Sequence, residues 1–248
     1  LAIQESWPTF VKGIPEFDLP PLDPYYTDFY ENKYENGEMR GTITTKDVRT
    51  YGIAKARFLS VKPTHSDNAL RLEIDVELPK LFLDGDYKVE GALGSFNIGG
   101  KGYFNISMEE VRTVFDIEGP IESDKWVVQH FRIAPEIGKM QVYFTDLFNG
   151  NQEMSKMASQ KVDYVIINYI RPIVERSCYI TNAREAILTE LPTLARVLLY
   201  QAALAFINEY WPTIYRGMLP YMTEMWDKYL TELANRFFSK VSFAQVFP

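Results

Sequence analysis

The sequence predicts an α+β fold in which a strongly curved antiparallel sheet wraps one long C-terminal helix, with an additional helical insert between them. Two observations predict it. Residues 37–148 form a succession of strand-like segments punctuated by glycine, and residues 206–239 carry a single apolar stripe at helical spacing. The 248 residues are 46% hydrophobic and 15% aromatic, which is enough apolar surface for one domain with a large core.

The strand region is clearest at Leu70–Leu78, where apolar and charged residues alternate without a break. A period of two is typical of a sheet with one dry face and one wet face. Further strands are expected at 104–108, 112–117, 126–133 and 140–144. Glycines are frequent between Gly85 and Gly102, and glycine inside a strand marks a bulge or a bend. We therefore expect the sheet to curl.

The C-terminal stripe steps along the chain by three and four residues. It consists of Ile207, Trp211, Ile214, Met218, Met222, Met225, Tyr229, Leu233 and Phe237. At 1.5 Å per residue this helix would be roughly 50 Å long, so something should wrap around it. Pro220 is interior to it and is expected to kink or split it. Residues 159–205 carry two further apolar stretches, which predict helices with breaks near Pro172 and Pro192.

The first 29 residues contain a proline-rich segment that cannot be the interior of a helix, because proline lacks the N–H and clashes with the preceding turn. We expect residues 1–29 to be an extended strap laid across the body. Residues 1–248 would then form one domain, with the strap at 1–29, the sheet at 37–148, the insert at 159–205 and the long helix at 206–239.

Composition excludes several classes of function. A formal net charge of -7 argues against nucleic acid and against electrostatic docking on anionic lipid, and no apolar run is long enough for stable membrane insertion. Two histidines, His65 and His130, and one cysteine, Cys178, supply a transition-metal site poorly. No nucleophile elbow or HExxH motif occurs, and Gly99–Gly102 lacks the ending of a phosphate loop. We expect no metal, no cofactor and no enzymatic activity.

Six short blocks, in order and spacing, resemble the takeout and juvenile hormone binding protein family of insects. The proline-rich opening and the central "P-x-L-x-L-x-G-x-Y" signature come first, followed by a glycine pattern, two asparagine-containing blocks and a closing "F-P". These blocks lie at Gly13–Pro24, Leu78–Tyr87, Gly91–Phe104, Leu147–Asn151, Asn208–Trp211 and Phe237–Pro248. No single block is specific, and the resemblance rests on their succession.

The resemblance implies a TULIP-like super-roll with an elongated apolar tunnel between helix and sheet. It implies a secreted carrier in haemolymph or another extracellular fluid, binding a terpenoid, juvenile-hormone-like, fatty-acid-like or carotenoid ligand. The chain departs from the family in two ways. The family's N-terminal cysteine pair has no counterpart here, and we recognise no counterpart for residues 159–205.

A carrier of this kind needs an apolar wall with few polar groups. From the strands we expect it to include Leu72, Ile74, Val76, Phe104, Val114, Val128, Met140, Val142 and Phe144. From the helix we expect Trp211, Ile214, Met218, Met222 and Met225. Each of these residues is equally a candidate for a filled core. A hydroxyl of Tyr87, Tyr103 or Tyr143 could orient the ligand, and Asn105, in Asn105-Ile106-Ser107, is a candidate glycosylation site that agrees with secretion.

Two other classes of function stay open at this point. One is a pigment-holding or structural assembly protein that uses residues 159–205 for oligomerisation. The other is a hydrolase of lipid esters, which is disfavoured because no nucleophile–base pair can be named from the sequence. A homo-oligomer or a receptor also stays open as a partner, beside the hydrophobic ligand itself.

Overall fold

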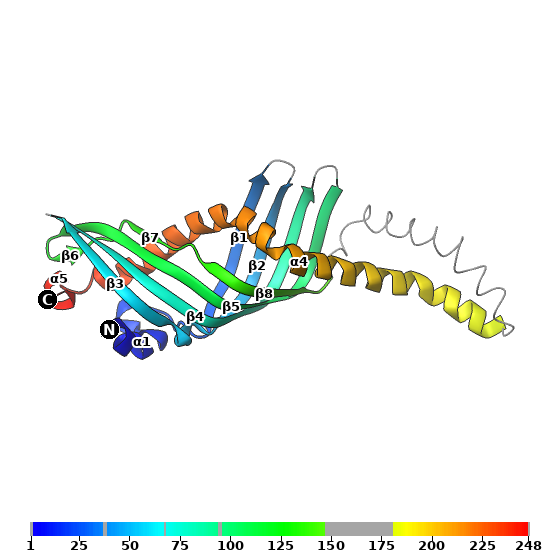
Figure 1. Ribbon diagram of the computed structural model, residues 1–248, viewed down its shortest axis with the longest axis horizontal. Helices are drawn as coiled ribbons and strands as arrows, with labels where there is room; N and C mark the ends of the chain where they lie inside the picture. Colours follow the sequence, from blue (N-terminus) through cyan, green and yellow to red (C-terminus); the bar gives the residue numbers. More distant parts are fainter. Residues whose placement is uncertain (1, 37–38, 67, 94–95, 147–180, 248) are drawn as a thin grey trace.

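The structure is a computed structural model that describes residues 2–36, 39–66, 68–93, 96–146 and 181–247. One antiparallel sheet curves around a long helix (Figure 1), so the predicted α+β fold class is confirmed. The helical elements are α1 (Ala2–Val11), η1 (Pro15–Phe17), η2 (Ile53–Lys55), α4 (Thr181–Phe238) and α5 (Phe243–Val246). The strands are β1 (Tyr25–Asn36), β2 (Met39–Tyr51), β3 (Arg57–Ser66), β4 (Ala69–Leu93), β5 (Phe96–Glu122), β6 (Lys125–Trp126), β7 (His130–Arg132) and β8 (Glu136–Phe144).

Two very long strands, β4 and β5, form the spine of the sheet. They pair antiparallel along their whole length, from Ala69 opposite Pro120 to Leu93 opposite Phe96. The first part of β4 pairs with β3 and the second part with β2, which in turn pairs with β1. On its other side β5 pairs with β8 and then with β7. The sheet therefore has two halves that share the same central hairpin.

The buried face of the hairpin changes parity in the middle. On β4 the buried residues are even-numbered up to Leu78, whereas further along Tyr87 is buried. On β5 Phe104 is buried in one half and Val111 in the other, and Glu110 between them has a φ of 57°. A residue with a left-handed backbone locally bends a strand. The bend at Glu110 keeps the buried face of β5 continuous, although the buried residues change from even-numbered before it to odd-numbered after it.

The helix α4 closes the open edge of the sheet through paired hydrogen bonds from asparagine side chains. Asn208 donates from Nδ2 to the carbonyl oxygen of Val142 at 2.9 Å and accepts from the Val142 N–H at 2.8 Å. Asn235 makes the same two contacts with Val128, at 2.7 Å and 3.0 Å. Each side-chain amide thus makes the two hydrogen bonds that a residue of a neighbouring strand would make. It pairs the backbone N–H and C=O that a sheet edge leaves without partners.

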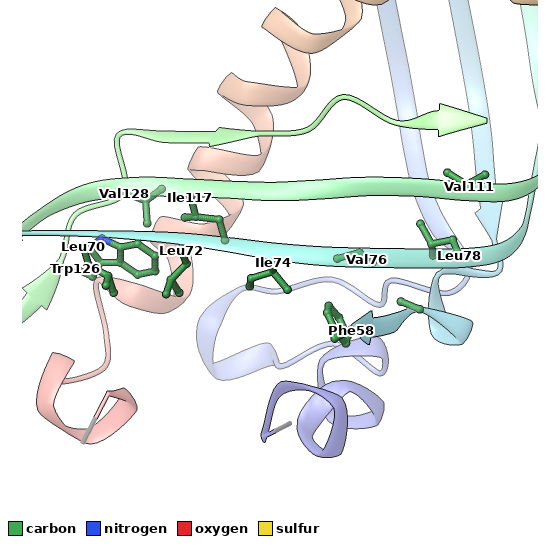
Figure 2. Packing of buried hydrophobic residues seen from close by; sticks show 11 residues of the cluster. Phe58, Leu70, Leu72, Ile74, Val76, Leu78, Val111, Ile117, Trp126 and Val128 are labelled. Atoms are coloured by element: carbon green, nitrogen blue, oxygen red, sulfur yellow. The ribbon is translucent and has the colours of Figure 1, made fainter. Parts of the chain in front are cut away.

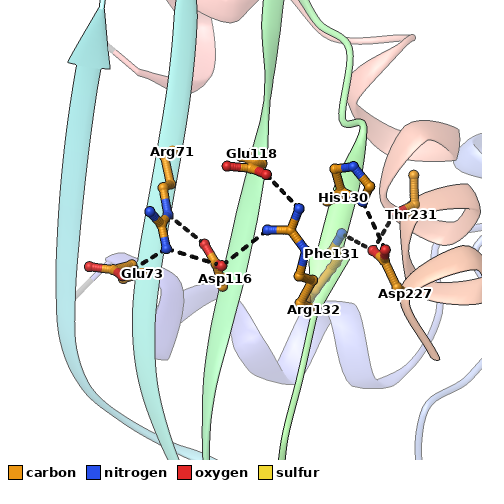
Figure 3. Close-up of polar contacts among 9 residues, drawn as sticks. All are labelled: Arg71, Glu73, Asp116, Glu118, His130, Phe131, Arg132, Asp227 and Thr231. Carbon is orange, nitrogen blue, oxygen red and sulfur yellow. Dashed lines mark hydrogen bonds and ion pairs between the residues drawn. The ribbon is translucent and has the colours of Figure 1, made fainter. Parts of the chain in front are cut away.

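Between these two amides Asp227 binds β7 (Figure 3). Its Oδ1 accepts from the N–H of Phe131 at 2.8 Å, and its Oδ2 lies 2.8 Å from Nδ1 of His130. On the opposite edge the hydroxyl of Tyr221 donates to the Glu35 carbonyl of β1 at 2.8 Å. The helix α4 is thus hydrogen-bonded to β1 at one edge of the curved sheet and to the β7–β8 side at the other edge. It therefore links the two edges of the sheet.

One end of the molecule is a tightly packed core, which we call the closed-end cluster (Figure 2). Its buried members are Ala56, Phe58, Leu70, Leu72, Ile74, Val76, Leu78, Val111, Ile117, Trp126 and Val128. Trp126 is 1% exposed, and its indole N–H donates to the carbonyl of Gly119 at 3.1 Å. Side chains of α1, of the last turns of α4 and of α5 cover this cluster, which anchors both ends of the described chain.

Several predicted boundaries differ from the structure. The last helix begins at Thr181 instead of residue 206. It continues through Pro192, where a break was predicted, and Pro220 does not split it. The strap predicted for residues 1–29 opens with α1 and ends inside β1. The rest of the predicted insert, including Pro172, lies outside the described residues. At Pro220, packing of the long apolar face of α4 against the sheet outweighs the local cost of the proline.

Candidate ligand-binding interior

The central part of α4 has one exposed stripe and one half-buried face. Between residues 211 and 230 only Thr213, Arg216, Pro220, Glu224 and Lys228 are exposed, at a spacing of three or four residues. All other positions in that stretch are half-buried, including the five predicted wall residues Trp211, Ile214, Met218, Met222 and Met225. The predicted stripe therefore faces the sheet, as its periodicity requires.

A second buried cluster lies in the other half of the sheet, and we call it the Tyr87 cluster. Val48, Tyr87 and Phe104 form its centre, and partly buried side chains of β4, β5, β8 and α4 pack against it. The helix contributes Tyr200 and Ile207 to this cluster, and Ala234 and Phe238 to the closed-end cluster. The five wall residues of α4 lie between these two positions and pack against neither cluster.

The predicted wall residues of the strands separate into three groups. Leu72, Ile74, Val76 and Val128 belong to the closed-end cluster, where the interior is filled by protein side chains. Phe104 and Phe144 belong to the Tyr87 cluster, and their rings stack with centroids 6.1 Å apart. Met140 and Val142, on β8, are half-buried and belong to neither cluster. The last group resembles the central residues of α4 in this respect.

The expectation that Val114 faces the interior is wrong. Val114 is 43% exposed, and it lies opposite Asp75, whose neighbours Ile74 and Val76 occupy the buried face. Of the three tyrosines named as alternative sources of a hydroxyl, Tyr103 and Tyr143 are also on the outside, at 37% and 43% exposed. Strand alternation places Val114, Tyr103 and Tyr143 on the outer face.

Tyr87, the third candidate, is buried in the Tyr87 cluster. Its hydroxyl donates to the carbonyl oxygen of Thr145 at 2.6 Å, so its proton is already used within the protein. Burial raises the pKa of Tyr87, and the negative charge of Asp146 adds to this effect. Tyr87 is therefore a neutral, hydrogen-bonded part of the core.

A polar group on the buried face of β1 was not predicted from the sequence. Tyr30, Asn32 and Tyr34 are half-buried or buried, whereas Glu31 and Lys33 between them are exposed. The amide of Asn32 donates to the Tyr34 hydroxyl at 3.3 Å. The strand was missed because residues 25–36 were divided between the strap and the region before the sheet. The alternation of charged with uncharged residues was the available signal.

The hydroxyl oxygen of Tyr30 is buried and has no hydrogen bond of normal geometry to the described residues. Asn32 and Tyr34 lie near enough to lower the pKa of Tyr30, but burial has the larger effect and raises it. Burial also raises the pKa of Tyr34. Both hydroxyls therefore keep their protons at neutral pH and are able to donate a hydrogen bond.

Pockets on the surface of the described part include one beside α4 and one at the ends of three strands. One, of about 400 Å³, lies where β5 and β8 meet α4, and the other, of about 380 Å³, lies at the ends of β1, β2 and β4. Of the predicted wall residues, Val142 alone lines either pocket. The half-buried Asn105 lines the first pocket, and its glycosylation stays a prediction.

Across the residues that the structure describes, no helix has both the length and the apolar character needed to cross a membrane. In the same residues, no three His, Cys, Asp or Glu side chains are grouped as a metal site requires. His130, one of the two histidines, is engaged with Asp227 at the contact between β7 and α4.

Comparison with known proteins agrees with this architecture. A family model described as "Haemolymph juvenile hormone binding protein (JHBP)" matches residues 1–175 and 195–248. The chain is similar to the "Circadian clock-controlled protein daywake" of Drosophila melanogaster, with 25% identity over 189 residues that cover 71% of this chain and 72% of that protein. Its fold is similar to that of Epiphyas postvittana Takeout 1, with a TM-score of 0.65, 19% identity, and coverage of 98% and 92% of the two chains.

The family match also narrows the region that was expected to lack a counterpart. It includes residues 159–175 and 195–205, so the stretch outside the match is 176–194. The expectation that all of 159–205 is without a counterpart is therefore wrong.

Proposed function

Because this chain belongs to the haemolymph juvenile hormone binding protein family, we propose that it is an extracellular carrier that holds a hydrophobic small molecule in its interior. The cargo would be an elongated apolar molecule of the terpenoid, juvenile-hormone-like, fatty-acid-like or carotenoid type. The proposed role is binding and transport in haemolymph or a similar fluid, without a catalytic step.

One observation supports this proposal more than any other. The apolar side chains in the centre of α4 are withdrawn from solvent on the sheet side, and yet they pack against neither buried cluster. Met140 and Val142 of β8 are likewise half-buried and pack against neither cluster. Three of the helical residues are methionines, whose flexible and polarisable side chains adapt to ligands of different shape. The ligand would occupy the space between these residues and the buried face of the sheet.

The energy available from such a contact is sufficient for a carrier. A chain that buries about 300 Å² of apolar surface gains roughly 7 kcal/mol, at about 25 cal/mol per Å². Part of this gain is lost to the ordering of the ligand. Since about 8 kcal/mol corresponds to a dissociation constant of about 1 μM, this contact alone gives a dissociation constant of about 10 μM or weaker, which suits reversible transport.

Organic extraction of the purified protein, followed by mass spectrometry, tests for a co-purifying apolar molecule. A substitution pair on α4 then tests the location. Met222→Trp fills the proposed space and should weaken binding of the neutral fluorescent probe N-phenylnaphthylamine about tenfold, because overpacking costs about 1–3 kcal/mol. Lys228→Trp, on the exposed stripe of the same helix, should leave binding unchanged. Equal affinity in both variants would contradict the proposed location.

An assembly role for residues 159–205 remains a second proposal. The first part of α4 projects beyond the sheet in Figure 1, and residues 176–194 lie outside the family match. Deletion of 176–194 should convert an oligomer to a monomer, measured by size-exclusion chromatography with light scattering. If the undeleted chain is already a monomer, this second role is wrong.

A further inference from the structure

We propose that Tyr30, Asn32 and Tyr34 form a polar anchor on the buried face of β1, and that this anchor binds a neutral oxygen of the ligand. The ligand class would be a long apolar molecule that carries a ketone, ester or alcohol group. The proposal rests on the carrier function and specifies the chemistry of the cargo.

The three side chains share one face with the Tyr87 cluster. In the β1–β2 register Tyr30 lies opposite Thr45, and in the β2–β4 register Thr45 lies opposite Tyr87. The ring of Tyr34 packs edge-on against Tyr221 of α4, with centroids 5.4 Å apart. The anchor therefore lies between the sheet and the central part of α4, which is the region where the apolar residues pack against no cluster.

An account of the hydrogen bonds leaves one donor unused. Asn32 donates to the oxygen of Tyr34, and this occupies one acceptor site on that hydroxyl. The oxygen of Tyr30 is shielded from solvent; Asn32 and Tyr34 approach it closely enough to lower its pKa, but no acceptor of normal geometry for its own O–H is present among the described residues. A buried hydroxyl that stays unpaired loses the hydrogen bonds it made to water, so a partner from the ligand would remove this cost.

The surroundings of the anchor select a neutral partner. Among the described residues, the side chains that shift the pKa of Tyr30 and Tyr34 are each other and Asn32, all of them uncharged. Lys33 and Arg40 line the surface pocket beside Tyr34, but both side chains are exposed and neither shifts the pKa of the two hydroxyls. A carboxylate or phosphate would be desolvated here without a counter-ion, which is far more costly than the burial of a ketone or ester oxygen.

The anchor also has a route to the surface. Tyr34 lines the pocket of about 380 Å³ at the ends of β1, β2 and β4. On the buried face beside it, Gly41 and Gly91 bring β2 and β4 so close together that a Cβ on Gly91 would lie 2.9 Å from the Cα of Gly41. No side chain from these two positions stands between the pocket and the Tyr34 ring.

The test uses the full chain and three probes of equal chain length: tridecanone, tridecane and tridecanoate. Each displaces N-phenylnaphthylamine from the wild type, from Tyr30→Phe and from the control Tyr26→Phe. Tyr26 is on the outer face of the same strand and is 49% exposed. Tyr30→Phe should weaken tridecanone about five- to tenfold, as expected for the loss of one hydrogen bond, and leave tridecane unchanged. Tridecanoate should bind the wild type more weakly than tridecanone.

The outcomes separate this proposal from the carrier function. If tridecane displaces the probe but Tyr30→Phe binds tridecanone as tightly as the wild type does, the anchor is wrong and the carrier stands. A lower melting temperature of Tyr30→Phe, with unchanged tridecanone affinity, would show that the hydroxyl is satisfied within the protein, and it also overturns the anchor. If neither N-phenylnaphthylamine nor tridecane binds the wild type, the carrier function itself fails.

Discussion

The closure of the sheet by α4 makes a sharp prediction at Asn235. Its side-chain oxygen accepts from the Val128 N–H at 3.0 Å, and its Nδ2 donates to the Val128 carbonyl at 2.7 Å. Val128 is only 2% exposed and belongs to the closed-end cluster. Replacement of Asn235 by alanine removes both partners at once and leaves two backbone groups of a buried residue unpaired.

The expected loss of stability follows from those two groups. Each unpaired buried backbone group costs about 1–3 kcal/mol. The better helix propensity of alanine offsets about 0.6 kcal/mol of that cost. The net destabilisation of Asn235→Ala should therefore be about 1.5–5 kcal/mol. For a domain of this size that corresponds to a fall in melting temperature of about 3–20 °C.

Thermal unfolding followed by circular dichroism, together with urea unfolding, measures this loss. The matched control is Glu232→Ala, one turn earlier on the exposed face of α4, which should change stability by less than about 0.5 kcal/mol. If Asn235→Ala is no less stable than the control, water replaces the amide without cost, and the reasoning that α4 completes the sheet edge is refuted.

Three further predictions follow from packing and charge. Gly91→Ala would place a Cβ 2.5 Å from a carbonyl oxygen of β2 and should cost about 1–3 kcal/mol in urea unfolding, whereas Gly217→Ala on α4, where a Cβ meets nothing within 4 Å, should stabilise by about 0.5–1 kcal/mol. Burial tends to raise the pKa of Asp227, but its hydrogen bonds from β7 outweigh burial and lower it. The stability it contributes is thus present above its unfolded pKa and lost as pH falls through the lower folded value, so Asp227→Asn should flatten the fall of melting temperature below about pH 4. Val114→Ser should change stability by less than about 0.5 kcal/mol, and the same change at the buried Val111 should cost about 2 kcal/mol or more; equal effects would show that the assigned faces are wrong.

Local patterns in the sequence were reliable where one periodicity ran without interruption. The alternation at Leu70–Leu78 predicted both a strand and its buried face, and the structure buries the apolar members. The stripe from Trp211 to Met225 predicted a helix whose half-buried side faces the sheet. In both cases the pattern reports burial directly, because the same side chains that repeat are those removed from water.

Prediction failed where the pattern changes phase. Val114 was expected inside, but the buried parity of β5 changes at Glu110, and no feature of the sequence there marks this irregularity. The polar anchor on β1 was missed because Tyr30 and Tyr34 are uncommon core residues when considered singly. Their burial depends on a helix that lies about 190 residues away along the chain.

The sequence by itself determined the fold class, the curled sheet, the long helix and the family, since these depend on local periodicity and on the order of short blocks. Only the tertiary structure decided which apolar residues fill the core and which border the proposed ligand space. It also decided that Asn208, Asp227 and Asn235 close the sheet edge, and that no acceptor of normal geometry for the Tyr30 O–H is present among the described residues. The physical reason is that burial and hydrogen-bond satisfaction depend on contacts between distant segments, which local pattern does not contain.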